Sequence, residues 1–127
     1  MKKTVYIIFI LGLVFTACSS SGSAGAADTA AKYIQALADK DKALITNLSC
    51  QEWEEAAILE VDGLLSVDAV VSNLVCEETG QEGINTLVNC SGSLNLTYND
   101  EIRAIDLSRR TYYLQEIESQ WRVCQYK

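Results

Sequence analysis

Cysteine is the residue type in this chain with the most evident chemistry, because its sulfur can form a disulfide, ligate a metal or carry a covalent modification. The sequence contains five: Cys18, Cys50, Cys76, Cys90 and Cys124. Their spacing includes no CxxC and the chain has no histidine, so zinc-ribbon and thioredoxin-like motifs are not supported. An odd count would leave one free thiol in an oxidising compartment, so one cysteine is expected to differ from the rest.

Cys18 is that cysteine, because of the residues in front of it. Met1-Lys2-Lys3 is basic, Val5 to Phe15 is almost entirely apolar, and small residues precede the cysteine in Phe15-Thr16-Ala17-Cys18. This order resembles the signal peptide and lipobox of bacterial lipoproteins. The resemblance implies cleavage before Cys18 and a diacylglycerol on its sulfur, which would anchor the protein to the membrane.

The apolar stretch is too short to serve as a permanent membrane span. It covers the 14 residues from Thr4 to Ala17, whereas a helix that crosses the hydrocarbon core needs about 20. A second interpretation is cleavage after Ala24-Gly25-Ala26, which would release a soluble secreted protein. Phe15 stands where a lipobox usually has leucine, but Thr16 and Ala17 fit, and we favour the lipidated form.

The rest of the chain divides into a short linker and one domain. We expect a signal peptide at residues 1–17, Cys18 with a flexible Ser/Gly/Ala tether at 18–27, and a single domain at 28–127. Without the signal peptide the chain has 8 basic and 17 acidic residues. Such a surface repels nucleic acid and anionic head groups. The lipid anchor makes the membrane the predicted partner, and nucleic acid is not expected as one. No metal and no cofactor are expected either.

Hydrophobic periodicity predicts helices first and strands afterwards. Asp28 is the expected N-cap of a helix that runs to Lys40, and shorter helices are expected at 43–48 and 51–61. Strands are expected at residues 67–76, 84–98, 102–116 and 120–126. Turns are expected near Thr79-Gly80, Gly83, Asn99-Asp100 and Glu118-Ser119. The fold class is therefore α+β, with N-terminal helices packed on an antiparallel sheet of about four strands.

Two segments resemble the nuclear transport factor 2-like, or cystatin-like cone, superfamily. They are the leading helix Ala30–Leu37 with Asp39-Lys40-Asp41 after it, and the ending Tyr112–Glu116 with Trp121–Cys124. The resemblance implies a curved sheet that wraps around the helices and encloses a pocket. The same superfamily includes, as more distant members, enzymes of the isomerase and cyclase type, which place an Asp, a His or a Tyr at the pocket floor.

Asp106 is the one catalytic candidate, with Tyr33, Tyr112 and Tyr113 as possible hydrogen-bond donors. The alternation around it places Ile105 and Leu107 on one face, so Asp106 is expected to face water rather than to act as a base. Aromatic side chains suit a half-buried wall, and the expected pocket wall consists of Tyr33, Trp53, Tyr113 and Trp121.

An acidic segment and a pair of arginines are expected to have structural roles. Glu52, Glu54, Glu55 and Glu60 lack the spacing of a calcium loop and are expected on a solvated helix face. Arg109-Arg110 is expected to pair with neighbouring acids.

The predicted hairpin around Gly83 places Cys76 and Cys90 at equal distances from its turn. They could therefore pair across the strands, which leaves Cys50 to bond Cys124. Pairing of Cys50 with Cys76 or with Cys90 is the alternative, because register cannot be fixed from sequence.

Two functions follow from these expectations. The favoured one is a membrane-anchored, non-enzymatic accessory domain that binds a small apolar ligand or a protein partner. The alternative is a pocket enzyme of the isomerase or cyclase type acting on a small hydrophobic substrate.

Overall fold

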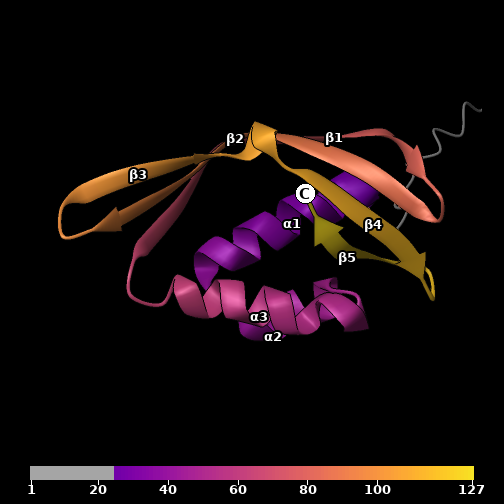
Figure 1. Ribbon diagram of the computed structural model, residues 1–127, viewed down its shortest axis with the longest axis horizontal. Coiled ribbons are helices and arrows are strands. Elements are labelled where there is room, and N and C mark those ends of the chain that lie inside the picture. The colour runs from indigo at the N-terminus through magenta and orange to yellow at the C-terminus, as the bar shows by residue number, and fades with distance from the viewer. Residues whose placement is uncertain (1–24) are drawn as a thin grey trace, which may run out of the picture.

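The computed structural model describes residues 25–127 (Figure 1), so the predicted signal peptide and Cys18 lie outside the described residues. Helices come first: α1 (Ala26–Asp39), α2 (Lys42–Leu48), the 3₁₀ turn η1 (Gln51–Trp53) and α3 (Glu54–Gly63). The sheet follows as β1 (Asp68–Glu82), β2 (Asn85–Tyr98), β3 (Glu101–Asp106), β4 (Thr111–Ile117) and β5 (Gln120–Tyr126), with the turn η2 (Leu107–Arg109) between β3 and β4. The α+β class with an antiparallel sheet is confirmed.

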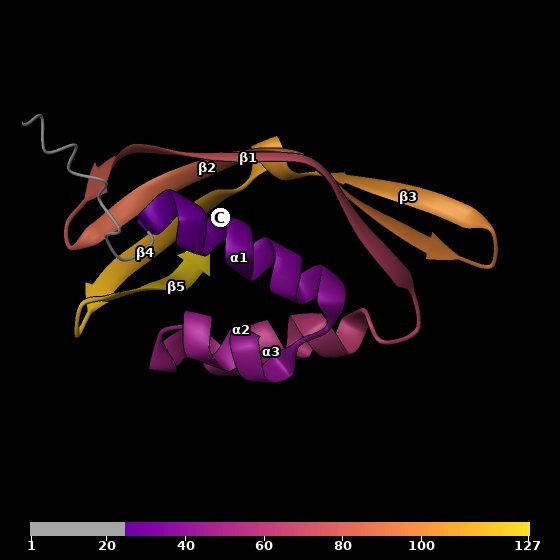
Figure 2. The same cartoon turned by 180° about the vertical axis from the view of Figure 1, so that it is seen from behind.

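The sheet bends over α1, and α2 and α3 form a further layer below it, as both views show (Figures 1 and 2). The core lies between α1 and the sheet. It is built from fully buried side chains of the helices and of the strands, chiefly Tyr33, Ile34, Leu37, Val88, Leu114 and Val123. No helix among residues 25–127 is both long and apolar enough to cross a membrane.

The first helix begins earlier than predicted. Its N-cap is Gly25 rather than Asp28, which lies in the first turn and makes no capping bond. Two residues assigned to the tether, Ala26 and Ala27, are helical, because alanine is the best helix former and Ala26 is completely buried in the core. The helix ends at Asp39, and its C-cap Lys40 adopts a left-handed conformation with φ 59°.

The sheet has five strands rather than four, because the strand predicted at 102–116 is two strands. The chain turns at η2, where the Asp106 carboxylate accepts hydrogen bonds from the Ser108 backbone N–H at 2.9 Å and from its hydroxyl at 2.6 Å. Leu107 is thereby turned into the core, where it is 1% exposed. β3 and β4 consequently pair with different parts of β2.

β1 and β2 form a long hairpin with antiparallel register from Asp68↔Thr97 to Glu82↔Asn85. The turn expected near Thr79-Gly80 is absent, since β1 continues to Glu82 and the chain reverses at Gly83, whose φ is 61°. A bulge interrupts the pairing opposite Gly92. Its φ is 108°, and a Cβ there would collide with the carbonyl oxygens of Ser72 and Asn73, so the bulge requires glycine.

Candidate functional site

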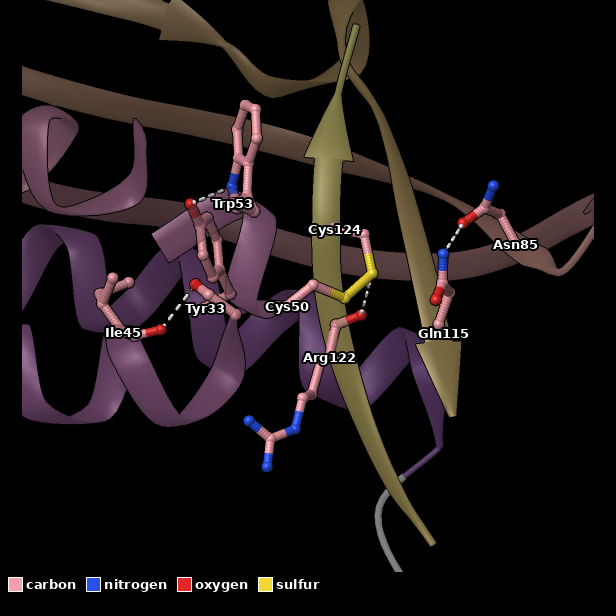
Figure 3. The surroundings of a disulfide bond; sticks show 9 residues. Tyr33, Ile45, Cys50, Trp53, Asn85, Gln115, Arg122 and Cys124 are labelled. Carbon is pink, nitrogen blue, oxygen red and sulfur yellow. Dashed lines mark hydrogen bonds between the residues drawn. A yellow bond between two sulfur atoms is a disulfide. The ribbon is translucent and has the colours of Figure 1, made fainter. Parts of the chain in front are cut away.

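Four aromatic side chains gather between the helices and the last two strands. Tyr33 of α1, Trp53 of η1, Tyr112 of β4 and Tyr126 of β5 form what we call the aromatic cluster. Ring centroids are 6.4 Å apart for Tyr33 and Tyr112, and 5.6 Å apart for Tyr126 with both Trp53 and Tyr112. The indole N–H of Trp53 donates to the Tyr33 hydroxyl at 3.0 Å (Figure 3). Edge-on contacts of this kind stabilise beyond the area they bury.

An ion pair between α3 and Arg110, the residue just before β4, lies beside the aromatic cluster. Arg110 donates from Nη1 to Glu60 Oε1 at 3.1 Å, and both side chains are only 20% exposed. The Tyr126 hydroxyl donates to the same carboxylate oxygen at 3.0 Å. The Arg110 guanidinium also lies over the Tyr126 ring, 4.3 Å from its centroid. The Glu60 carboxylate thus binds both Arg110 and Tyr126, and a cation–π contact joins these two to each other.

Burial keeps the tyrosines of this cluster protonated. Desolvation is the main cause that raises the pKa of Tyr33 and of Tyr112, and the negative charge of Glu60 adds to it in both cases. Desolvation and the same carboxylate raise the pKa of Tyr126 to about 12. The Tyr112 hydroxyl is buried and finds no hydrogen-bond partner within residues 25–127. These hydroxyls are therefore suited to donate hydrogen bonds and unsuited to act as bases at neutral pH.

We expect the folded state to lose stability above about pH 10. Unfolded tyrosines ionise near their ordinary pKa of 10, whereas Tyr126 stays protonated to about 12 in the fold, so the unfolded state binds fewer protons in that interval. Stability from this group is complete below pH 10 and declines as the pH rises toward 12. Urea unfolding at pH 8 to 11.5 measures the decline. Tyr126→Phe, which removes the ionising hydroxyl, should show a shallower decline than the unaltered protein; an equal slope would contradict the assignment.

Asp106 lies apart from the aromatic cluster, on the exposed end of β3. Its carboxylate is held by Ser108 and lies 3.9 Å from the guanidinium of Arg109, and its side chain is 56% exposed. The hydrogen bonds from Ser108 lower the pKa of Asp106 below its ordinary value. A carboxylate that is solvated, capped and more acidic than usual is a poor general base, as the alternation of the sequence indicated.

The other predicted wall residues are separated. Tyr113 is buried but pairs with Leu87 across the strands, on the opposite side of the sheet from Tyr112, and the Lys127 ammonium lies 4.7 Å from its ring centroid. Trp121 lines an open hollow of about 310 Å³ near the start of α1, together with Lys32 and Leu48. The four expected wall residues therefore do not line one pocket.

Two disulfides connect the four cysteines of the domain. Cys76 bonds Cys90 across β1 and β2, at directly opposed positions, and Cys50 bonds Cys124 in β5 (Figure 3). This is the first of the two arrangements considered from the sequence. The segment that holds Cys50 is fixed further by its backbone N–H, which donates to the carbonyl of Val123 at 2.8 Å. Disulfides persist in oxidising compartments, which indicates a location outside the cytoplasm.

The acidic residues of η1 and α3 do not all face water as predicted. Glu52 is exposed, but Glu60 lies on the side of α3 that faces Arg110 and Tyr126 of β5. Its partner Arg110 was expected to pair with an acid and does so, across 50 residues of sequence. Glu60 follows Ala57 by three positions, and Ala57 and Val61 are both buried, so the helical spacing already placed Glu60 beside the buried face. This spacing could have predicted the partial burial of Glu60, but the many acidic residues in the segment favoured a solvated face instead.

Comparison with known proteins supports the fold. No protein-family model matches the sequence, and no curated protein matches it either. Among solved structures, a SEC-C motif containing protein from Rhodopseudomonas palustris is similar with a TM-score of 0.53 at 10% identity, over 79% of this chain and 75% of that one. At that identity the similarity concerns the fold alone.

Proposed function

We propose that this protein is an exported lipoprotein, anchored to the membrane by a lipid on Cys18, whose domain binds a partner and carries out no catalysis of its own. The start of α1 is the observation that carries this proposal. The Gly25 carbonyl accepts a hydrogen bond from the Thr29 N–H at 3.0 Å, and Ala26 is completely buried. Cleavage after Ala26 would remove both from the folded domain. Cleavage before Cys18 would leave α1 intact, which favours the lipidated over the soluble secreted form.

The cysteine pairing supports the same proposal. Four of the five cysteines are joined in disulfides within residues 25–127. Cys18 is the remaining one, and a free thiol is uncommon in an exported protein. Acylation of Cys18 would account for it. With 17 acidic residues in the mature chain and no basic cluster, covalent lipid would be the main source of membrane affinity.

Two features favour a binding domain over an enzyme. Asp106 is solvated and capped, and the aromatic cluster fills the space between the helices and the last two strands. Binding would then use the outer surface. The hairpin of β2 and β3 extends beyond the helices (Figure 1), with Tyr98 58% and Ile102 73% exposed, and is a suitable contact for a protein partner. The order of helices and strands also agrees with membership of the nuclear transport factor 2-like superfamily, which we keep as part of the proposal.

One observation favours the pocket enzyme as a second candidate. Such an enzyme needs a sheltered carboxylate with a tyrosine in hydrogen-bond reach, and Glu60 with Tyr126 meets that description at 3.0 Å. Arg110 occupies the same carboxylate oxygen, so a substrate would have to displace the guanidinium first. That requirement makes this function the weaker of the two.

Native mass spectrometry of the protein, taken from its own membrane without reduction, tests the proposal. We expect a chain that begins at Cys18, carries the mass of its acyl groups and lacks the four hydrogens lost in forming two disulfides. A chain that begins at Ala27 without lipid would contradict the anchoring. A small hydrophobic molecule retained in the spectrum and released by Glu60→Gln would favour the pocket enzyme instead.

A further inference from the structure

Three segments of the domain come together at one end of the molecule. The start of α1, the turn between β1 and β2, and the turn between β4 and β5 all lie there, while the turn between β2 and β3 lies at the other end (Figures 1 and 2). A side chain added at Gly25 would lie 3.8 Å from the Glu78 carboxylate of β1, which places the beginning of the domain beside this hairpin. We call this part of the molecule the N-terminal end.

The two turns at the N-terminal end present isoleucines to solvent. Ile84 is the second residue of the two-residue turn that Gly83 begins, and it is 80% exposed. Ile117 precedes the turn Glu118-Ser119 and is 37% exposed. Both turns are tight, since each joins strands that are paired up to the turn residues. Each turn therefore contains or adjoins a solvent-exposed isoleucine at the N-terminal end.

The hollow of about 310 Å³ lies between the β4–β5 turn and the helices α1 and α2. Its wall combines the apolar surfaces of Trp121 and Leu48 with the ammonium group of Lys32 and the amides of Asn47 and Gln120. Tryptophan prefers the level of lipid head groups, because its ring is apolar and its N–H is polar. A lysine beside it offers a counter-charge to a phosphate.

The charges at the N-terminal end select the kind of lipid. Glu82, Glu116 and Glu118 lie at or next to the two turns and are exposed. They would repel an anionic bilayer. A zwitterionic phospholipid presents a phosphate to Lys32 and an ammonium group to the glutamates, so it matches both signs of charge.

We propose that the N-terminal end of the domain contacts the bilayer directly, with Ile84 and Ile117 in the head-group region and a zwitterionic head group in the hollow lined by Trp121 and Lys32. This inference rests on the proposed anchor at Cys18. Gly25 lies seven positions after Cys18, and a random-coil linker of that length reaches about 15 Å on average. The anchor would therefore hold the hollow close to the membrane and turn the β2–β3 hairpin away from it.

Tryptophan quenching tests the contact, because the chain has only two tryptophans. Trp53→Phe leaves Trp121 as the reporter, and Trp121→Phe leaves Trp53, which lies in the aromatic cluster and serves as the matched control. The full lipidated protein is reconstituted into phosphatidylcholine vesicles that carry bromine on their acyl chains. We expect Trp121 to lose about half of its emission, as an interfacial tryptophan would, and Trp53 to lose little.

A second pair of measurements makes the outcome specific. Ile84→Ser with Ile117→Ser should reduce the quenching of Trp121 at least twofold, and replacing part of the phosphatidylcholine by phosphatidylglycerol should reduce it as well. Equal quenching of both tryptophans, or stronger quenching with the anionic lipid, would overturn the contact. Co-flotation with vesicles reports the anchor separately: protein that floats without quenching refutes only the contact, and protein that does not float refutes the lipoprotein function and the contact with it.

Discussion

Removal of the Cys50–Cys124 disulfide, by replacing both cysteines with serine, is expected to lower the free energy of unfolding by about 4.5 kcal/mol. The bond spans 74 residues, and the loop-closure model assigns about this value to a loop of that length. Small domains have a total stability of only about 5 to 15 kcal/mol. The variant should therefore be largely unfolded in moderate urea, as circular dichroism would report.

The second disulfide provides the matched control. Cys76→Ser with Cys90→Ser opens a loop of 14 residues, for which the same model gives about 3 kcal/mol. The first variant should consequently unfold at a lower urea concentration than the second. The reverse order would mean that the contacts of the β1–β2 hairpin, rather than loop closure, decide how much each bond contributes.

Replacement of Arg110 by methionine is expected to destabilise the fold by about 2 to 3 kcal/mol, close to the lower limit for breaking a buried ion pair. The change would leave the Glu60 carboxylate, 20% exposed, without its cation, and would remove the cation–π contact with Tyr126. Equilibrium unfolding in urea measures the loss.

Arg109→Met is the control for that substitution, since the neighbouring side chain is 86% exposed. It should change the stability by less than about 0.5 kcal/mol. Combining Arg110→Met with Glu60→Gln should cost less than the sum of the two single changes, because the uncompensated charge is then absent. Strict additivity would argue that the pair does not interact in solution.

The order of elements could be read from the sequence because its periodicity is strong. Helical spacing in α1 and alternation in β2 depend on side-chain types that each element itself supplies. The division of residues 102–116 could not be read in the same way, since it depends on a hydrogen bond from Ser108 to Asp106 and on burial of Leu107. Such a break is decided by tertiary packing, which local patterns do not contain.

The candidate site was predictable only in part for a related reason. Tyr33 and Trp53 were expected at the interior because they are aromatic and lie at helical positions. The ion pair between Glu60 and Arg110 joins α3 to the residue between η2 and β4, and nothing local to either residue specifies the other. Charge composition suggested a solvated face for Glu60. Its spacing from Ala57 places it beside the buried face of α3, and its contacts with Arg110 and Tyr126 complete its burial.

The nested arrangement of the two disulfides has a consequence for how the chain must oxidise. Cys76–Cys90 lies entirely within the loop closed by Cys50–Cys124, so Cys50 pairs with the last cysteine of the chain and not with the next one, Cys76. A chain that crosses a membrane N-terminus first would present Cys50 and Cys76 together before Cys90. Oxidation at that moment would give the wrong bond. Correct maturation therefore requires either that the β1–β2 hairpin forms before oxidation or that a disulfide isomerase corrects the first product.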